Sequence, residues 1–408
     1  MRQDEILKRT GGGALPMPSP LALSDRAKSL RPSLTLEISA RAKALRSEGQ
    51  DICSLSAGEP DFDTPDFILE ATQKALRDGI TRYGPAAGDP DLRAAVAEKL
   101  TNENGIPTTS AQVLITNGGK QAIYNLFQVL LDPGDEVLIP APFWLSYPAI
   151  ASLAGAESRL IPSQAKEGFR LDLDQLEQAI TPRSKVLVLN SPGNPTGRVM
   201  DRSELEAIVN LMHRHPQLCV MSDEIYEYLL AEGQTHCSFG SLDESLADRC
   251  FTVNGFAKGW AMTGWRLGYL AGAESVIRAA TALQSQSTSN VCSFAQRGAL
   301  AALQGSRQCV ETMAASYNRR RRLLSEGLQT INGITLSDPQ GAFYAFPQLP
   351  HGSGNSVDFC RRALEDQGLA MVPGAAFGDD SCIRMSCAVS HETIEDGLRR
   401  LRTLLNSA

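Results

Sequence analysis

The sequence lacks any uninterrupted apolar run of the ~18 residues that a membrane-spanning helix needs. It also lacks a basic surplus, because 39 Lys and Arg stand against 46 Asp and Glu and give a formal net charge of −7. This balance argues against a general nucleic-acid surface. The first residues are acidic, and no apolar run typical of a secretory signal follows them. We therefore expect a cytoplasmic protein with neither a membrane nor a nucleic-acid partner.

Metal-binding cysteine patterns are also missing. None of the nine cysteines forms a C-x-x-C pair or a Cys/His cluster with zinc spacing, so no metal is expected. An odd number of cysteines cannot pair completely within one chain. Free thiols in a reducing compartment are the simpler expectation.

The chain of 408 residues is too long for one comfortable core, and its pattern predicts two domains. Residues 1–23 hold three consecutive glycines and three prolines, and we expect a flexible tail there. Apolar strands alternate with helices over 51–304, which predicts a large α/β domain whose mostly parallel sheet is covered by helices. Residues 24–50 are expected to join 305–408 in a smaller α+β domain.

Two local patterns give further predictions. Thr64 is expected to cap a helix that begins at Pro65, since proline favours the first helical position. Four consecutive arginines at 319–322 lie in a predicted helix. Such a charge run usually marks a face turned to solvent.

Glycines and polar residues gather where the predicted strands end. Gly118, Gly119 and Lys120 follow one strand, Asn194 follows another, Asp223 ends a third and Lys258 follows a fourth. Ligands of open α/β sheets bind at the carboxyl ends of the strands. This placement predicts a small-molecule site.

Lys258 stands among apolar residues that include Phe256 and Trp260. Burial of this run would lower the lysine pKa and leave a neutral amine that can form a Schiff base with an aldehyde. Arg266 offers a planar fork of donors that suits a phosphate. Together the two residues suggest pyridoxal phosphate (PLP). The alternative is an exposed loop lysine beside an arginine in a surface ion pair.

The glycine pair Gly118-Gly119 lies between a strand and a helix, where free N–H groups and the helix dipole favour an anion. It is not a Walker A loop, because Leu114 and Gln121 occupy the positions of a required glycine and of Ser or Thr. The alternative is an ordinary tight turn.

Five other residues have both a chemical and a structural interpretation. Asp223 can pair with a pyridinium nitrogen or cap a helix. Tyr226 and Asn194 can hydrogen-bond a ring oxygen, although Asn194 also fits a plain turn. Trp144 can stack on a ring or pack in the core. Arg384, in an apolar strand, can clamp a substrate carboxylate or form an internal ion pair.

Several motifs in one order carry a family resemblance over residues 24 to 405. They are Asn-Pro-x-Gly at Asn194, Ser-Asp-Glu-x-Tyr around Asp223, the context of Lys258, and Met-Thr-Gly-Trp-Arg ending at Arg266. This set resembles fold-type I PLP enzymes of the class I aminotransferase family. The stretches that follow Ala57 and Gly118 look like the bacterial aspartate aminotransferase branch.

The resemblance implies a seven-stranded-type sheet and a set of roles for PLP. Lys258 would carry the cofactor as a Schiff base, and Asp223 would pair with its ring nitrogen. It also implies a homodimer with shared active sites, in which Tyr83 of the partner subunit binds PLP. The residues of the same chain implied to bind PLP are Gly118, Gly119, Lys120, Trp144, Asn194, Asp223, Tyr226, Lys258 and Arg266. The catalytic set is Lys258, Asp223 and Tyr226. Gly255 departs from the serine that many members use against the phosphate.

The same resemblance implies the substrates. An amino group would move between aspartate or glutamate and a 2-oxo acid such as 2-oxoglutarate, in a ping-pong reaction. Lys120, with Thr35, would meet the distal carboxylate, and Arg31 matches a position that accompanies prephenate use. The implied substrate-binding set is Arg31, Thr35, Gly58, Lys120, Trp144, Asn194 and Arg384. The alternatives are a prephenate or broader-specificity aminotransferase, a β-lyase or synthase, and a PLP-binding regulator without catalysis.

Overall fold

The computed structural model describes residues 23–29 and 34–406. The chain divides into two compact units, residues 1–31 and residues 32–408. The described part of the first unit contains one helix, α1 (Asp25–Ser29). The elements below belong to the second unit. Among the described residues, no helix is both long and apolar enough to cross a bilayer.

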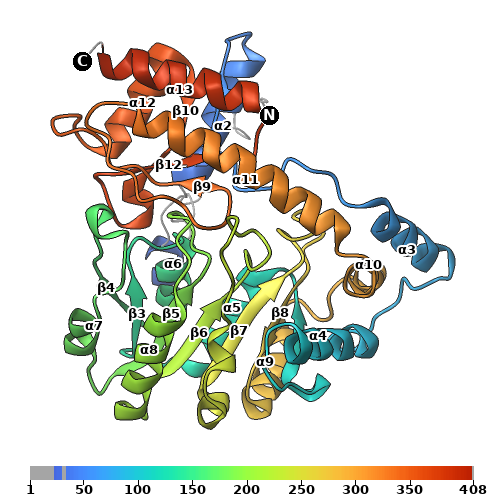
Figure 1. Cartoon of the computed structure of the whole chain (residues 1–408). Coiled ribbons are helices and arrows are strands. Elements are labelled where there is room, and N and C mark those ends of the chain that lie inside the picture. Colours follow the sequence, from blue (N-terminus) through green and yellow to red (C-terminus); the bar gives the residue numbers. More distant parts are fainter. Residues whose placement is uncertain (1–22, 30–33, 407–408) are drawn as a thin grey trace, which may run out of the picture. The chain divides into compact units, whose positions relative to one another are not determined.

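A seven-stranded sheet with the order β2-β8-β7-β6-β5-β3-β4 forms the centre of the second unit (Figure 1). Its strands are β2 (Val113–Thr116), β3 (Glu136–Pro140), β4 (Glu157–Ile161), β5 (Ser184–Asn190), β6 (Cys219–Asp223), β7 (Cys250–Gly255) and β8 (Gly268–Ala271). Only β8 is antiparallel to its neighbours, so the predicted mostly parallel sheet is confirmed. Sequence analysis missed β8, because four residues that begin with glycine give a weak strand signal.

Helices cover both faces of this sheet because successive strand residues point to opposite sides. The helices are α3 (Asp66–Arg77), α4 (Pro90–Asn102), α5 (Gly119–Leu130), α6 (Ser146–Leu153), α7 (Leu173–Ala179), α8 (Arg202–Arg214), α9 (Glu274–Ser287) and α10 (Ser293–Gln304). Val137 and Ile139 of β3 pack with α5, α6 and α9. Leu138, between them, packs with α7 and α8 on the other face. Residues of α3, α4 and α10 cover β2 and β8.

The remaining elements surround two small sheets. The antiparallel sheet β11-β12-β9 contains β9 (Tyr344–Ala345), β11 (Val372–Pro373) and β12 (Ile383–Ser386), and β1 (Cys53–Ser54) pairs in parallel with β10 (Leu369–Ala370). The helices here are α2 (Leu34–Ser47), α11 (Gln308–Gln329), α12 (Ser356–Gln367) and α13 (His391–Asn406). Leu324, Phe359 and Leu398 join three of these helices in one core. The boundaries of the two predicted domains stay a prediction.

Thr64 does not cap α3, and that prediction was wrong. The helix begins at Asp66, and no side chain bonds its first N–H groups. The Thr64 hydroxyl instead donates to the carbonyl of Ala261 over 2.9 Å and accepts from Nε1 of Trp265 over 3.0 Å. Thr64 therefore fixes the loop that follows Lys258.

The arginine run 319–322 is not a uniformly solvated face either. Arg321 is buried in α11, and its Nη1 donates to the carbonyl of Ala342 over 2.5 Å. Arg320 pairs with Asp61 over 2.7 Å. The helical period of 3.6 residues turns one member of any four-residue run toward the core, and here that member satisfies a buried carbonyl.

Candidate active site

Lys258 lies in the loop after β7, where it is half-buried among aromatic rings. Its Nζ is 5.7 Å from the ring centroid of Tyr226 and 5.5 Å from that of Phe343, and it donates to the Gly58 carbonyl over 2.5 Å. Desolvation, then the positive charges of Arg384 and Arg266, lower the Lys258 pKa to about 8. The rings are not those of Phe256 and Trp260, which the sequence placed beside the lysine, but the lowered pKa leaves an amine that is a usable nucleophile near neutral pH.

Asp223 ends β6 with its carboxylate buried, only 5% exposed. Its Oδ2 accepts a hydrogen bond from the Tyr147 hydroxyl over 2.7 Å, and its Oδ1 accepts from the N–H of Ile225 over 3.3 Å. Burial raises the Asp223 pKa to about 6, while the bond from Tyr147 opposes that shift. A turn rather than a helix follows, so the helix-cap interpretation is wrong. The site offers a buried carboxylate to a cationic ligand group.

Arg384 projects from β12 into the same region. Its Nη1 donates to Oδ1 of Asn194 over 3.0 Å, and its Nη2 donates to the Ser56 carbonyl over 3.1 Å. The guanidinium carbon is 4.4 Å from the ring centroid of Tyr344 and 5.0 Å from that of Phe377. Within the described residues no carboxylate pairs with this buried cation, and its Nε has no partner. The internal ion pair is therefore absent, and a ligand carboxylate would supply the missing charge.

Arg266 and the start of α5 together form a cradle for an anion. Gly118 precedes α5 with φ +81°, and no side chain caps the helix. A Cβ on Gly118 would lie 2.5 Å from Nη2 of Arg266. Arg266 itself has φ +56°, a backbone conformation that a non-glycine residue adopts only when its surroundings impose it. Uncapped N–H groups beside a guanidinium favour a phosphate.

The other predicted residues lie around this centre or outside the described part. Lys120 is exposed, its Nζ is 5.0 Å from the Trp144 ring, and desolvation and Arg266 lower its pKa. Tyr83 is 93% exposed. Arg31 lies outside the described residues, and Thr35 belongs to α2 with no description of its side chain.

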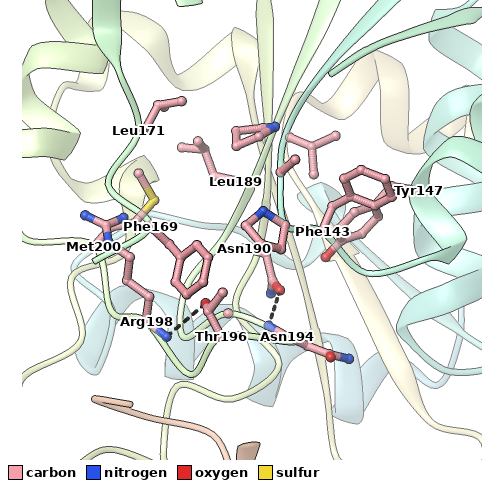
Figure 2. A pocket seen from close by; sticks show the side chains of 15 residues that line it. Phe143, Tyr147, Phe169, Leu171, Leu189, Asn190, Asn194, Thr196, Arg198 and Met200 are labelled. Atoms are coloured by element: carbon pink, nitrogen blue, oxygen red, sulfur yellow. Dashed lines mark hydrogen bonds between the residues drawn. The ribbon is translucent and has the colours of Figure 1, made fainter. Parts of the chain in front are cut away.

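A small cavity lies behind Asn194 (Figure 2). Its volume is about 60 Å³, which suits a few waters and not a pyridine ring with a phosphate. Oδ1 of Asn190 accepts from the backbone N–H of Asn194 over 2.9 Å, and Nδ2 of Asn190 donates to the Asp223 carbonyl over 3.0 Å. Asn190 thus fixes the positions of Asn194 and Asp223 relative to each other.

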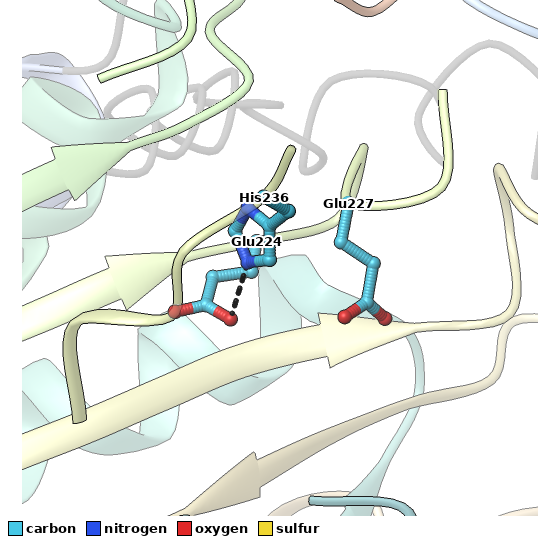
Figure 3. Close-up of side chains that lie close together, drawn as sticks. All are labelled: Glu224, Glu227 and His236. Atoms are coloured by element: carbon cyan, nitrogen blue, oxygen red, sulfur yellow. Dashed lines mark hydrogen bonds and ion pairs between the residues drawn. The ribbon is translucent and has the colours of Figure 1, made fainter. Parts of the chain in front are cut away.

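A polar cluster follows Asp223 in the chain (Figure 3). Glu224, Glu227 and His236 come close enough to hold a metal ion, the one such group among the described residues. However, Lys99 already pairs with Glu227 over 2.5 Å, and Nε2 of His236 is 3.0 Å from Glu224. Burial alone would lower the His236 pKa, but Glu224 raises it. The cluster supplies its own positive charges, so we assign no ion to it.

Sequence reasoning missed Tyr147, Asn190 and Tyr344. Tyr147 hydrogen-bonds Asp223, and Asn190 hydrogen-bonds Asn194. Tyr344 lies on β9, in a different sheet from the strand ends that indicated the site. One signal was available, since Tyr147 follows Trp144 by three positions, a spacing that would place both side chains on one side of a helix.

Comparison with known proteins identifies the family. The model of the family described as aminotransferase class I and II matches residues 50–401. This chain belongs to that family. The resemblance read from the motifs is confirmed, and so is the fold-type I architecture. Membership of this family implies PLP as the cofactor.

Named relatives of this aminotransferase are similar over almost its whole length. The bifunctional aspartate aminotransferase and glutamate/aspartate-prephenate aminotransferase of Petunia hybrida is 45% identical over an alignment of 398 residues, and this alignment covers 94% of this chain and 83% of the relative. The aspartate/prephenate aminotransferase of Thermus thermophilus is 44% identical over 95% of this chain and 99% of its own. A solved Thermus thermophilus aspartate aminotransferase with maleate superposes with a TM-score of 0.90 at 43% identity, covering 94% of this chain and 100% of that one. The chain is thus a transaminase, and the lyase, synthase and regulator alternatives are set aside.

Proposed function

We propose that this aminotransferase moves the amino group of L-aspartate or L-glutamate to a 2-oxo acid, chiefly 2-oxoglutarate, in a ping-pong reaction with PLP. The observation that carries the proposal is the convergence of the Lys258 amine, the buried Asp223 carboxylate and the uncompensated Arg384 guanidinium at one edge of the sheet. The amine can react with the PLP aldehyde, the carboxylate can pair with the pyridinium nitrogen of PLP, and the guanidinium can bind the carboxylate of a substrate.

The residues present fit PLP. Gly118, Gly119 and Arg266 would hold the phosphate in the cradle that a Cβ at Gly118 would fill. The residues that would hold the ring are Trp144 by stacking, Asp223 at the nitrogen, Asn194 and Tyr226 at the 3′-oxygen, and Lys258 at the aldehyde carbon. A Cβ on Gly255 would lie 2.7 Å from the Leu267 carbonyl oxygen, so serine would not fit here without a backbone shift. Lys120 and backbone N–H groups would make the phosphate contact that a serine makes in other family members.

Lys258 would act as the base of the reaction. PLP, when bound, supplies an electron sink for the charge left by removal of the substrate α-proton. With a pKa near 8, about a tenth of the Lys258 amines are neutral at pH 7. With PLP bound, the Lys258 amine would be the group that accepts the α-proton and delivers it back. Asp223, held by Tyr147, would keep the ring nitrogen protonated, and Arg384 would orient the α-carboxylate together with Asn194 and the Gly58 backbone.

Lys120 would meet the distal carboxylate of an acidic substrate. Its ammonium is exposed beside Trp144, and it makes no ion pair within the described residues. Lys120→Ala should lower kcat/KM for aspartate relative to a neutral amino acid by about 10-fold, the value of one charged hydrogen bond. Lys166→Ala, at another exposed lysine that belongs to the turn after β4, should leave the ratio unchanged. An unaltered ratio in Lys120→Ala would remove the acidic-donor proposal.

Prephenate use is a second candidate, because the names of relatives from Petunia hybrida and Thermus thermophilus include it. Arg31 would then be the residue that accompanies prephenate use, as the family resemblance implies. The test compares kcat/KM for prephenate and for 2-oxoglutarate in the wild type and Arg31→Ala. A loss confined to prephenate supports the role, and equal losses with both acceptors refute it.

We also propose a cytoplasmic homodimer in which Tyr83 of each chain completes the site of the other. The 93% exposure of this aromatic side chain within one chain supports the idea. Mixing Tyr83→Ala with Lys258→Ala tests it, because a mixed dimer would combine both defects in one site and leave the second intact. Activity should return on mixing. If Tyr83 serves its own chain, no intact site forms and none returns.

A further inference from the structure

Tyr226 and Tyr344 form a buried pair of hydroxyl groups in the candidate site. Their oxygens are 2.9 Å apart, and the side chains are 4% and 1% exposed. Tyr226 follows β6 of the large sheet, whereas Tyr344 lies in β9 of the small one. The hydrogen bond therefore joins two sheets at the site, and only one of the two hydroxyls can donate it at a time.

Tyr344 also contacts Arg384. The guanidinium carbon is 4.4 Å from the Tyr344 ring centroid, a cation–π geometry in a water-poor setting. Ser386, two residues along β12 from Arg384, pairs with Tyr344 across the ladder and fixes this approach. The Tyr344 hydroxyl lies 3.8 Å from the place a Cβ on Gly58 would take. Gly58 in turn accepts the hydrogen bond from Lys258. The Tyr344 ring thus contacts the guanidinium, and its hydroxyl lies near the glycine that accepts from the lysine.

The direction of the hydrogen bond should depend on the charge at Arg384. A nearby cation makes a hydroxyl a better donor and a poorer acceptor, so an uncompensated guanidinium favours donation from Tyr344 to Tyr226. The Tyr226 proton is then free for another acceptor in the site. A carboxylate bound at Arg384 cancels much of that field and lets Tyr226 donate to Tyr344 instead.

We propose that Tyr344 is a positioning residue that couples carboxylate binding at Arg384 to the hydrogen bond that Tyr226 makes with the cofactor ring. This inference rests on the proposed function, because it assumes a carboxylate at Arg384 and PLP at Lys258. Two features of the pair support it. Burial raises the pKa of both phenols, so both protons stay in place near neutral pH, and Arg384 pulls both pKa values in the opposite direction.

Other charges facing the pair are few. Lys258 is 5.7 Å from the Tyr226 ring, Asp223 raises the Tyr226 pKa, and the Cys387 thiol raises the Tyr344 pKa. Among the described residues, Arg384 is the charge that acts on both phenols and has no carboxylate partner. Arg384 is therefore the charge whose effect on the two phenols a bound carboxylate would change most.

The test uses the holoenzyme reconstituted with PLP and maleate, a dicarboxylate without an amino group to transfer. The pH midpoint of the cofactor's visible absorption is measured with and without saturating maleate in the wild type, Tyr344→Phe and Tyr317→Phe. Tyr344→Phe keeps the ring over Arg384 and removes only the hydroxyl. Tyr317→Phe is the matched control, since Tyr317 is a buried phenol of the same core whose hydroxyl bonds Asp61.

Maleate should move the midpoint in the wild type and in Tyr317→Phe by the same amount. In Tyr344→Phe the shift should fall by roughly half or more, because the hydroxyl path is lost while the direct field of Arg384 and its hydrogen bond to Asn194 remain. An undiminished shift in Tyr344→Phe overturns the inference and leaves the proposed function standing. A wild type that binds no PLP overturns both.

A double-mutant cycle with Tyr226→Phe gives an independent check. If the two hydroxyls act as one unit, removing the second after the first changes the maleate shift little. Additive losses would mean that Tyr344 acts without Tyr226, which contradicts the coupling. Thermal midpoints of all variants show whether each has folded.

Discussion

The hydroxyl of Tyr147 donates a hydrogen bond to Oδ2 of Asp223 over 2.7 Å, with both side chains buried. This bond opposes the burial that raises the Asp223 pKa to about 6. Tyr147→Phe should therefore raise that pKa further and leave a larger neutral fraction of Asp223 at pH 7. A neutral carboxyl holds a pyridinium poorly, so the dissociation constant for PLP should rise by about 10-fold. Fluorescence titration of the apoenzyme with PLP measures it.

Tyr269→Phe is the control for this prediction. Tyr269 is a buried phenol of β8, in the same sheet as Asp223, and its hydroxyl has no hydrogen-bond partner within the described part of the chain. Its loss should leave PLP affinity unchanged. Equal affinities for the two variants would show that the bond to Asp223 does not support the cofactor.

Lys258 should give the apoenzyme a distinctive pH dependence. Desolvation and two arginines lower its pKa to about 8, so the neutral amine grows as pH rises and is nearly complete above pH 9. The rate of reconstitution with PLP should rise about tenfold per pH unit below 8 and then level off. Stopped-flow absorbance from pH 6 to 10 tests this. A rate that climbs steadily to pH 10 would indicate an ordinary lysine.

Gly118→Ala should damage the phosphate cradle specifically. The new Cβ would lie 2.5 Å from the Arg266 guanidinium, at a residue with φ +81°. Gly134→Ala is matched, because Gly134 has φ +94° and nothing within 4 Å of its Cβ position. Both changes should cost about 1–2 kcal/mol of stability from backbone strain. Only Gly118→Ala should also release PLP on gel filtration; retention equal to that of Gly134→Ala counts against the cradle.

Arg384→Lys should separate charge from geometry. Lysine keeps the cation but loses the fork that donates to Asn194 and the Ser56 carbonyl. We expect kcat/KM for both substrates to fall by about 10- to 100-fold, mainly through KM, because a charged hydrogen bond is lost. Arg321→Lys, at another buried arginine, should affect stability and not KM. Steady-state kinetics with aspartate and 2-oxoglutarate decide between them.

Much of the site could be predicted because the ends of apolar strands can be recognised in the sequence. Asp223, Asn194 and Lys258 each follow an apolar strand, and parallel strands bring their carboxyl ends to one edge. Arg384 was visible as a charge in an apolar strand. Its approach to Asn194 was not, because the pair spans 190 residues and two sheets.

The supporting residues escaped prediction for a related reason. Tyr147 and Tyr344 carry no charge, and aromatic residues in apolar segments are usually core. Thr64 was assigned to the nearest helix, yet its hydroxyl bonds Ala261 and Trp265, about two hundred positions away in the chain. A local sequence pattern carries no information about such distant partners, so it assigns the residue to the nearby helix end.

The most direct test of the central claim is the visible absorption spectrum of the purified protein with PLP, before and after L-aspartate. The account predicts a cofactor band that depends on Lys258, shifts to that of pyridoxamine phosphate on addition of aspartate, and is accompanied by one equivalent of oxaloacetate. A band that aspartate leaves unchanged would refute the acidic donor. A protein that shows no band at all with added PLP would contradict the account at its base.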